Sequence, residues 1–190
     1  MPTIVAFILM SLDGAVDDPK LYFQPSERPD DPFTWDEQTD EFERLTTSTQ
    51  DAVLLGRGMW DEWRGFWPGV SSPFADFINA VPKHVLTSRP LDGEWPGSRP
   101  VAGPLAHVVA DVKASGARDV GVHGSIQLVQ SLLAADLLDE LRIVASPVAG
   151  APGRRLFENL PTTRRYRLAD AASTPTGNLL LTYDTRPAGR

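Results

Sequence analysis

One stretch constrains the fold more than any other, because a short apolar strand runs through a glycine directly into an amphipathic helix. The stretch covers residues 119–133 and changes from strand to helix at Gly124. Past that glycine, apolar residues recur three and four positions apart, so one helix face can pack on a sheet. Ser125 is suited to cap the helix, and the N–H groups of the first turn form a natural site for an anion. A well-capped turn without a ligand would have the same sequence, so this stretch alone leaves both interpretations open.

Other apolar segments predict strands that alternate with helices. Residues 3–10 and 51–56 are continuous apolar runs of strand length, which is typical of strands covered on both faces, and residues 83–87 predict a third strand. Spacing and turn residues predict helices at 35–47, at 74–81 and from Pro104 to a stop at Gly116, and loops at 17–33 and 91–99. The first loop is longer than common connections, which is typical of functional flaps.

The last part of the chain predicts strands with no helix between them. Residues 140–148 predict an extended strand, and residues 164–168 can pair with 178–184 as an antiparallel hairpin across 169–177. The expected fold class is therefore α/β, a three-layer α/β/α arrangement around a mixed, mostly parallel sheet with a C-terminal antiparallel hairpin. The length suits one domain over residues 1–190.

Composition excludes several classes of partner and chemistry. The net charge of -7 argues against nucleic acid or an anionic membrane as the partner. The absence of cysteine excludes disulfides, thiolate metal sites and a cysteine nucleophile. The histidines His84, His107 and His123 show no metal-ligand spacing, so no metal is expected. With no apolar run long enough to span a membrane and no signal-peptide pattern, we expect a cytoplasmic protein.

Four turns are expected at the carboxyl ends of the parallel strands, where ligands bind in sheets of this kind. Two of them are glycine-bearing strand-to-helix turns suited to phosphates, and two carry an arginine that can fork onto phosphate oxygens. Together they suggest a dinucleotide with an additional phosphate, which points to NADP. The turns are Asp13-Gly14, Gly56-Arg57-Gly58, Thr87-Ser88-Arg89 and Gly124-Ser125.

Segments along most of the chain resemble a known family. They are similar to the dihydrofolate reductase-like family, specifically the branch of the C-terminal reductase domain of the bifunctional riboflavin biosynthesis deaminase-reductase. The order and spacing of the segments carry this resemblance, because each one alone is short. They are Ser11-Leu-Asp-Gly14, Leu54-Leu-Gly-Arg57, Lys83-His-Val-Leu-Thr-Ser88, Gly124-Ser125, Asp139-Glu-Leu-Arg142 and Gly150-Ala-Pro-Gly-Arg-Arg-Leu-Phe157. A Rossmann G-x-G-x-x-G fingerprint is absent, so the nicotinamide assignment depends on the resemblance.

The resemblance implies an NADPH-dependent reductase that transfers hydride to a C=N or C=O group of a small, heterocyclic substrate of the riboflavin-pathway pyrimidine or pteridine type. It implies a pyrophosphate and ribose site at the turn after the second strand, a 2′-phosphate site at Arg57 and the next turn, and a nicotinamide side at the 124–127 turn. Met59 departs from the family, which usually has threonine or serine there. The implied cofactor-binding residues are Gly56, Arg57, Gly58, Met59, Thr87, Ser88, Arg89, Gly124, Ser125, Ile126 and Gln127.

Hydride transfer also needs a group that supplies a proton to the neighbouring heteroatom. Asp13 is the first candidate because it follows the first strand, although it can equally be a turn-former bonded to its own backbone. Asp40 is the second candidate, roughly where folate-reducing relatives carry a substrate-binding acid. The alternative for Asp40 is a solvated acidic helix face that includes Glu43.

Several other features of the sequence can be interpreted in two ways. Arg154 and Arg155 can reach a substrate phosphate or remain solvated, and Trp60, Trp63 and Trp67 form an aromatic stripe that is better explained by core packing. Relatives of the riboflavin branch are commonly dimers, so the resemblance implies a homodimer that binds a small-molecule substrate. The alternative function is a non-catalytic nucleotide- or ligand-binding protein that retains the fold.

Overall fold

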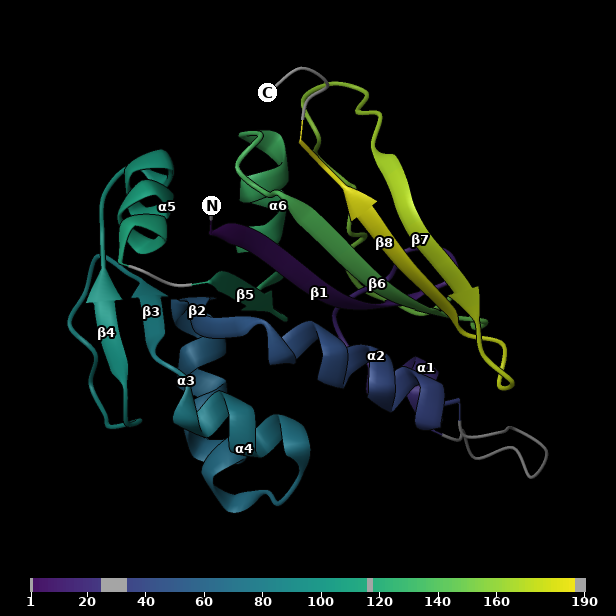
Figure 1. Ribbon diagram of the computed structural model, residues 1–190, viewed down its shortest axis with the longest axis horizontal. Coiled ribbons are helices and arrows are strands. Elements are labelled where there is room, and N and C mark those ends of the chain that lie inside the picture. Colours follow the sequence, from purple (N-terminus) through teal and green to yellow (C-terminus); the bar gives the residue numbers. More distant parts are fainter. Residues whose placement is uncertain (1, 25–33, 116–117, 187–190) are drawn as a thin grey trace.

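A computed structural model describes residues 2–24, 34–115 and 118–186 of the chain. Its eight strands form one sheet in the order β4-β3-β2-β5-β1-β6-β8-β7 (Figure 1). The first six strands in this order run parallel, and β8 and β7 are antiparallel to their neighbours. The strands are β1 (Thr3–Ser11), β2 (Gln50–Gly56), β3 (Lys83–Leu86), β4 (Ser98–Val101), β5 (Asp119–His123), β6 (Glu140–Ser146), β7 (Arg167–Ser173) and β8 (Leu179–Asp184).

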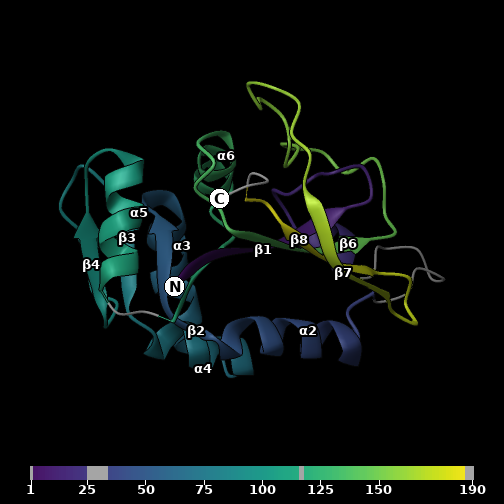
Figure 2. The same ribbon diagram turned by 45° about the horizontal axis from the view of Figure 1, so that its top comes forward.

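Helices cover both faces of this sheet, which confirms the three-layer α/β expectation (Figures 1 and 2). The helices α5 and α6 pack on one face against residues such as Ile4 and Leu54. On the other face, α3 and α4 pack around the fully buried Trp60, while α1 and α2 pack near Phe7. The helices are α1 (Lys20–Phe23), α2 (Glu37–Ser48), α3 (Arg57–Phe66), α4 (Pro73–Ala80), α5 (Leu105–Ala114) and α6 (Ile126–Ala134), with a 3-10 turn at Trp67–Gly69.

Two elements differ from the sequence-based expectation. The segment expected as loop up to Arg99 contains the start of β4, a short edge strand that is exposed or half-exposed and therefore lacks an apolar pattern. The long loop after β1 contains α1, whose four residues are too few for a helical period. The expected helix stop at Gly116 and part of the loop at 25–33 lie outside the described residues.

The C-terminal hairpin is confirmed, but its turn is much shorter than expected. Strand β7 runs to Ser173, and the turn closes with a hydrogen bond of 2.9 Å from Thr174 N–H to the Asn178 carbonyl. All seven residues of β7 are exposed, so the strand has no alternation of buried and exposed positions from which to predict it. The expected strand at 164–168 overlaps β7 only at its end.

The turn of this hairpin also holds the start of α2. Asp36 caps α2 by accepting a hydrogen bond of 2.9 Å from Thr39 N–H. The Thr176 hydroxyl donates to the same carboxylate at 2.6 Å, and Asn178 Nδ2 donates to Thr39 Oγ1 at 3.2 Å. The position of α2 therefore depends on a part of the chain about 140 residues further along, as the separation of Asp36 and Thr176 shows.

None of the helices in the described part of the chain is long and apolar enough to span a bilayer.

Candidate active site

The two glycine-bearing turns predicted to bind an anion lie against each other at the carboxyl edge of the sheet. Strands β2 and β5 are neighbours, and the Gly56 N–H donates a hydrogen bond of 3.0 Å to Ser125 Oγ. Gly124 has a φ of 66°, and a Cβ at this position would lie 3.0 Å from Met59 Cε. A side chain at position 124 would therefore strain the backbone and press on the neighbouring turn.

The helices that follow these turns, α3 and α6, both begin without a side-chain cap. The expectation that Ser125 caps α6 is wrong, because its hydroxyl instead accepts the N–H of Gly56 from the neighbouring turn. Two adjacent helix N-termini without side-chain caps direct N–H groups and positive dipole ends to the same region, which suits a pyrophosphate. A Cβ on Gly58 would meet nothing within 4 Å, so there is open space beside the start of α3.

Arg57 lies in this region, but other groups already use its guanidinium. Its Nε donates to Asp61 at 2.9 Å, its NH1 donates to the Pro90 carbonyl at 2.8 Å, and its NH2 pairs with Asp92. These contacts connect α3 to the loop after β3. Arg57 therefore lies next to the Thr87-Ser88-Arg89 turn, as expected. Its contacts with Asp61, Pro90 and Asp92 compete with the binding of a phosphate.

The turn after β3 offers a different arginine. The Arg89 N–H donates to Thr87 Oγ1 at 3.1 Å, and the Ser88 and Arg89 side chains are exposed. Within the described residues, the Arg89 guanidinium makes no hydrogen bond or ion pair. A 2′-phosphate in this region would therefore meet Arg89 and Ser88 more readily than Arg57.

A cavity of about 870 Å³ adjoins the turn after β5 on the side covered by α2. Its walls come from β1, α2, the end of α3 and the start of α4, and it reaches Gly124 and Ile126 at the start of α6. Gln127, the next residue, is exposed. The cavity and the helix N-termini are therefore adjacent sites. Five aromatic side chains line the cavity, namely Phe7, Trp35, Trp63, Trp67 and Phe74.

Glu43 is the acid with the most unusual environment in this cavity. It lies on the face of α2 that also carries Asp40 and Thr47, three and four residues away. It is half-buried, and none of the described residues hydrogen-bonds its carboxyl group. Burial, with the nearby charge of Asp40, raises the pKa of Glu43 to about 7. At neutral pH this group can therefore hold or release a proton.

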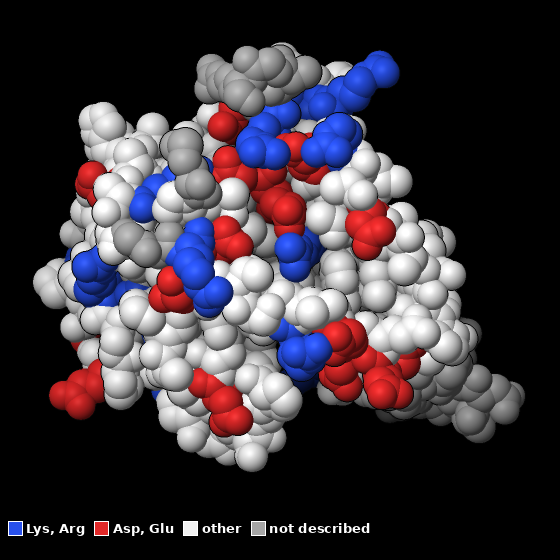
Figure 3. All heavy atoms as spheres, viewed as in Figure 1, with Lys and Arg blue, Asp and Glu red and all other residues white. Residues whose placement is uncertain are grey.

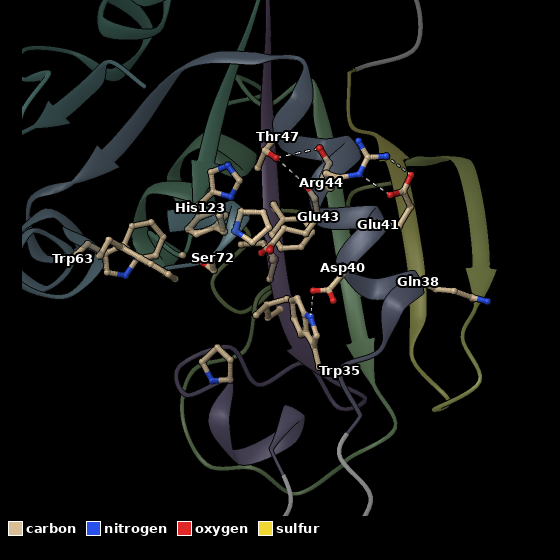
Figure 4. A pocket seen from close by; sticks show the side chains of 18 of the residues that line it. Trp35, Gln38, Asp40, Glu41, Glu43, Arg44, Thr47, Trp63, Ser72 and His123 are labelled. Atoms are coloured by element: carbon tan, nitrogen blue, oxygen red, sulfur yellow. Dashed lines mark hydrogen bonds and ion pairs between the residues drawn. The ribbon is translucent and has the colours of Figure 1, made fainter. Parts of the chain in front are cut away.

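Asp40 lines the same cavity, as its prediction as a site residue requires, but in a more exposed position. The Trp35 Nε1–H donates a hydrogen bond to its carboxylate at 2.5 Å. Figure 4 shows Asp40 and Glu43 on the side of α2 toward Trp35 and His123, with Glu41 and Arg44 on the other side. Both acids therefore face the cavity, and Glu43 is the one whose pKa lies near neutral pH.

His123 forms part of the cavity wall at the end of β5 and is only 2% exposed. Its Nε2 lies 2.7 Å from Gln50 Oε1, which assigns the proton to Nε2, and Nδ1 has no partner among the described residues. Burial lowers the pKa of His123 to about 3, so the ring is neutral. A Cβ on Gly121 would collide with the side chain of Gln50, which explains a glycine inside a buried strand.

Asp13, the first candidate proton donor, is not among the residues that line the cavity, so its catalytic role remains a prediction that this geometry does not favour. In the sheet, Phe7 pairs with His123, so β1 continues four residues beyond the end of β5 and carries Asp13 past the turns. The Ser11 hydroxyl and the Gly150 N–H donate to its carboxylate, and these bonds, with nearby Arg155, lower the pKa of Asp13. An ionised, paired carboxylate is a poor proton donor.

The two arginines considered for a substrate phosphate are also paired. Arg154 Nε donates to Asp17 at 2.7 Å, and Arg155 NH2 donates to Asp13 at 3.1 Å. The aromatic stripe divides between two roles. Trp60 belongs to the core, as expected, whereas Trp63 and Trp67 are half-buried and line the cavity.

Glu43 and His123 are the residues that the sequence analysis did not select. The three-residue spacing from Asp40 to Glu43 places both on one helix face, and this spacing was visible in the sequence. The direction in which this face points depends on how α2 packs against the sheet, and no local sequence pattern shows that packing.

With the geometry described, the chain can be compared with known proteins. A family model described as the RibD C-terminal domain matches residues 103–181, which is less than half of the chain. No curated protein matches the sequence. A putative riboflavin biosynthesis protein from Shewanella sp. PV-4 has a similar structure, with a TM-score of 0.72 and 22% identity, and the match covers 96% of this chain and 98% of that one.

Two further solved structures are similar to this chain at lower sequence identity. A diaminohydroxyphosphoribosylaminopyrimidine deaminase/5-amino-6-(5-phosphoribosylamino)uracil reductase from Thermotoga maritima has a TM-score of 0.65 and 13% identity, with 96% of this chain and 56% of that one covered. A dihydrofolate reductase from Enterococcus faecalis, complexed with NADP(H), has a TM-score of 0.60 and 13% identity, covering 96% and 95%. These similarities confirm the dihydrofolate reductase-like fold, and the family model shows a similarity to the riboflavin reductase branch over residues 103–181.

Proposed function

We propose that this protein is an NADPH-dependent reductase that transfers hydride to a C=N or C=O group of a small heterocyclic substrate of the pyrimidine or pteridine type. The observation that carries the proposal is the adjacency of two features. Two helix N-termini without side-chain caps meet at Gly56 and Ser125, and beside them lies an aromatic cavity containing an acid poised near neutral pH, Glu43.

The residues present fit a nicotinamide dinucleotide. The N–H groups at the starts of α3 and α6, with the open space beside Gly58, suit a pyrophosphate, and Gln127 is exposed in the first turn of α6. Ser88 and Arg89 suit the additional phosphate that distinguishes NADPH from NADH. When bound, the reduced cofactor supplies hydride to the substrate carbon. Its occurrence in the Enterococcus faecalis structure supports the choice of cofactor.

The chain's own groups would prepare the substrate. Aromatic walls at Trp35, Trp63 and Phe74 stack a flat ring and keep water away from it. Protonated Glu43 can donate to the heteroatom beside the carbon that accepts hydride, after which the carboxylate regains a proton from solvent. Asp40 keeps the local potential negative, which favours the protonated form of Glu43.

Cofactor preference tests this proposal directly. The wild-type protein should bind NADPH at least about tenfold more tightly than NADH, because a guanidinium on a phosphate oxygen is a strong, charge-assisted contact. Arg89→Ala should remove most of this preference, measured by titration calorimetry with both cofactors. Arg167→Ala, on the exposed strand β7, is the control: it removes an ion pair with Asp184 but should leave the affinity for both cofactors unchanged. Equal affinity of the wild type for both cofactors would contradict the 2′-phosphate assignment.

Turnover separates the reductase from the alternative of a non-catalytic binding protein. Single-turnover oxidation of NADPH should be followed with a panel of pteridines, pyrimidinediones and small carbonyl compounds. Oxidation that depends on one of these compounds supports the reductase. Tight NADPH binding with no oxidation across the panel would favour the binding protein, for which the departure at Met59 is the sequence argument.

A further inference from the structure

The loop that follows β3 is fastened at its far end by buried groups. The Trp95 side chain is 3% exposed, and its Nε1–H donates a hydrogen bond of 2.9 Å to Asn79 Oδ1 on α4. The fully buried Lys83 donates from Nζ to the Pro96 carbonyl at 3.0 Å, and this Nζ lies 4.7 Å from the centre of the Trp95 ring. Contacts within the protein therefore fix this end of the loop.

Arg57, at the start of α3, holds the near end of the same loop. Its NH1 donates to the Pro90 carbonyl at 2.8 Å, and its NH2 pairs with Asp92. Asp61, one turn further along α3, accepts from Arg57 Nε at 2.9 Å and so orients the guanidinium. Because Pro90 directly follows Arg89, these contacts lie next to the turn proposed for the additional phosphate of the cofactor.

The two partners of the ion pair between Arg57 and Asp92 differ in exposure. The Arg57 side chain is 16% exposed, whereas the Asp92 side chain is 75% exposed. Asp92 can therefore turn into water while the contacts of Pro90 and Trp95 hold the loop backbone on either side of it. Ion pairs with an exposed partner contribute little to stability, so another anion can replace the Asp92 carboxylate at low cost.

Paired arginines are common on this protein, because its sequence has 25 acidic and 18 basic residues. Figure 3 shows one face on which lysines and arginines lie next to acidic residues. The pair of Arg57 and Asp92 differs from these by its position, since α3 begins there without a side-chain cap. The N–H groups and the positive dipole end of α3 attract an anion to this place. Such an anion would compete with Asp92 for the guanidinium.

We propose that Asp92 determines the cofactor preference by occupying Arg57 in place of the additional phosphate of NADPH. This inference rests on the proposed function and concerns the regulation of its cofactor site. A carboxylate and a phosphate monoester both present oxygen acceptors to a guanidinium, so only one of them can use the NH2 group that Asp92 occupies. Asp92 thereby limits the contribution of Arg57 and leaves Arg89 as the main contact. Without the Asp92 charge, both guanidinium groups can meet the phosphate.

Two small nucleotides isolate the additional phosphate. Adenosine 2′,5′-bisphosphate carries it and adenosine 5′-monophosphate lacks it, and titration calorimetry gives the ratio of their affinities. Asp92→Asn should raise this ratio about fivefold at low salt, because it removes the competing charge and keeps the size of the side chain, and the gain should shrink at high salt. Glu94→Gln, the same change of charge at an exposed position on the same loop, should change the ratio less than about twofold.

A double-variant cycle tests whether Asp92 acts through Arg57. In an Arg57→Gln background, Asp92→Asn should change the ratio less than about twofold, because the competition has no guanidinium left to act on. A gain that persists in this background would show that Asp92 acts by its charge alone and would overturn the proposal. An unchanged or lower ratio in the single Asp92→Asn variant would also overturn it.

Oxidation of NADPH is measured separately, so that the two proposals can fail independently. If Asp92→Asn raises the ratio but no compound of the panel is reduced, the reductase proposal fails and the assignment of Asp92 stands. If the wild type oxidises NADPH but the ratio does not rise in the variant, the reverse holds. A wild-type protein that binds neither nucleotide would contradict the assignment of Asp92 whatever its activity.

Discussion

The two halves of the candidate site are built in different ways. The region at the starts of α3 and α6 consists of backbone N–H groups and glycines, and two turns define it. The cavity wall consists of side chains on α2, and a hairpin near the other end of the chain holds that helix in place. A local motif therefore predicts the first region, whereas the second depends on contacts between distant segments. Four substitutions separate the two.

The largest effect is expected at Gly124, where the two halves meet. Gly124→Val should lower NADPH affinity at least about a hundredfold, because a branched side chain at a φ of 66° is strained and presses on Met59. Gly103→Val is the control, since Gly103 has a φ of 119° and its added Cβ would meet nothing within 4 Å. Titration calorimetry measures the affinity, and thermal unfolding measures the cost to the fold.

Gly58→Val provides a second variant in case Gly124→Val does not fold. The added side chain has open space in the protein, so the melting temperature should change little. NADPH affinity should still fall about tenfold if the pyrophosphate passes this position. Unchanged NADPH affinity in a folded Gly58→Val protein would show that the cofactor does not use the start of α3.

A smaller effect, confined to the cavity, is expected at Glu43. Glu43→Gln should lower kcat about a hundredfold, the contribution typical of a general acid, and leave NADPH affinity unchanged. The pKa of about 7 fixes the pH dependence of the wild type. The acid must be protonated, so the rate should be constant below this pKa and fall about tenfold per pH unit above it. A wild-type profile that rises with pH would exclude Glu43 as the donor.

The smallest effect is expected from the hairpin turn that positions α2. Thr176→Val removes a donor to Asp36 at 2.6 Å and should lower the free energy of unfolding by about 1 kcal/mol. Because α2 would move slightly, KM for the substrate should rise about threefold while NADPH affinity stays constant. Ser173→Ala, in exposed β7, is the control. A change in NADPH affinity without a change in KM would contradict the division of the site.

The success of the sequence analysis follows the same division. The buried strands β1 and β2 are continuous apolar runs, and the shorter β3 and β5 each contain buried valines next to a turn, so these strands and the turns after them were predictable. β1 extends past the end of β5, and this extension depends on the register of the sheet, which the sequence does not show. The sequence analysis therefore placed Asp13 at the site. The exposed strand β7 and the edge strand β4 lack apolar periodicity and were placed imperfectly or missed.

For the acids of α2, the sequence identified the helix and its charges but could not show which turn faces the cavity. Asp40, Glu43 and Glu41 have the same residue chemistry, and only the orientation set by the Asp36 contacts distinguishes them. The pKa of Glu43 depends on burial by packing, which composition does not reveal. The sequence thus predicted a helix that lines the cavity and an acid, Asp40, one turn from Glu43.

The placement of the cavity acids on a single helix has an evolutionary consequence. Replacing residues at the positions of Asp40, Glu43 and Thr47 would alter which molecule is accepted, yet these positions are not part of the glycine turns. Under the proposed reductase function, substrate preference can therefore change by substitution along one face of α2, while the glycine turns at the starts of α3 and α6 stay the same.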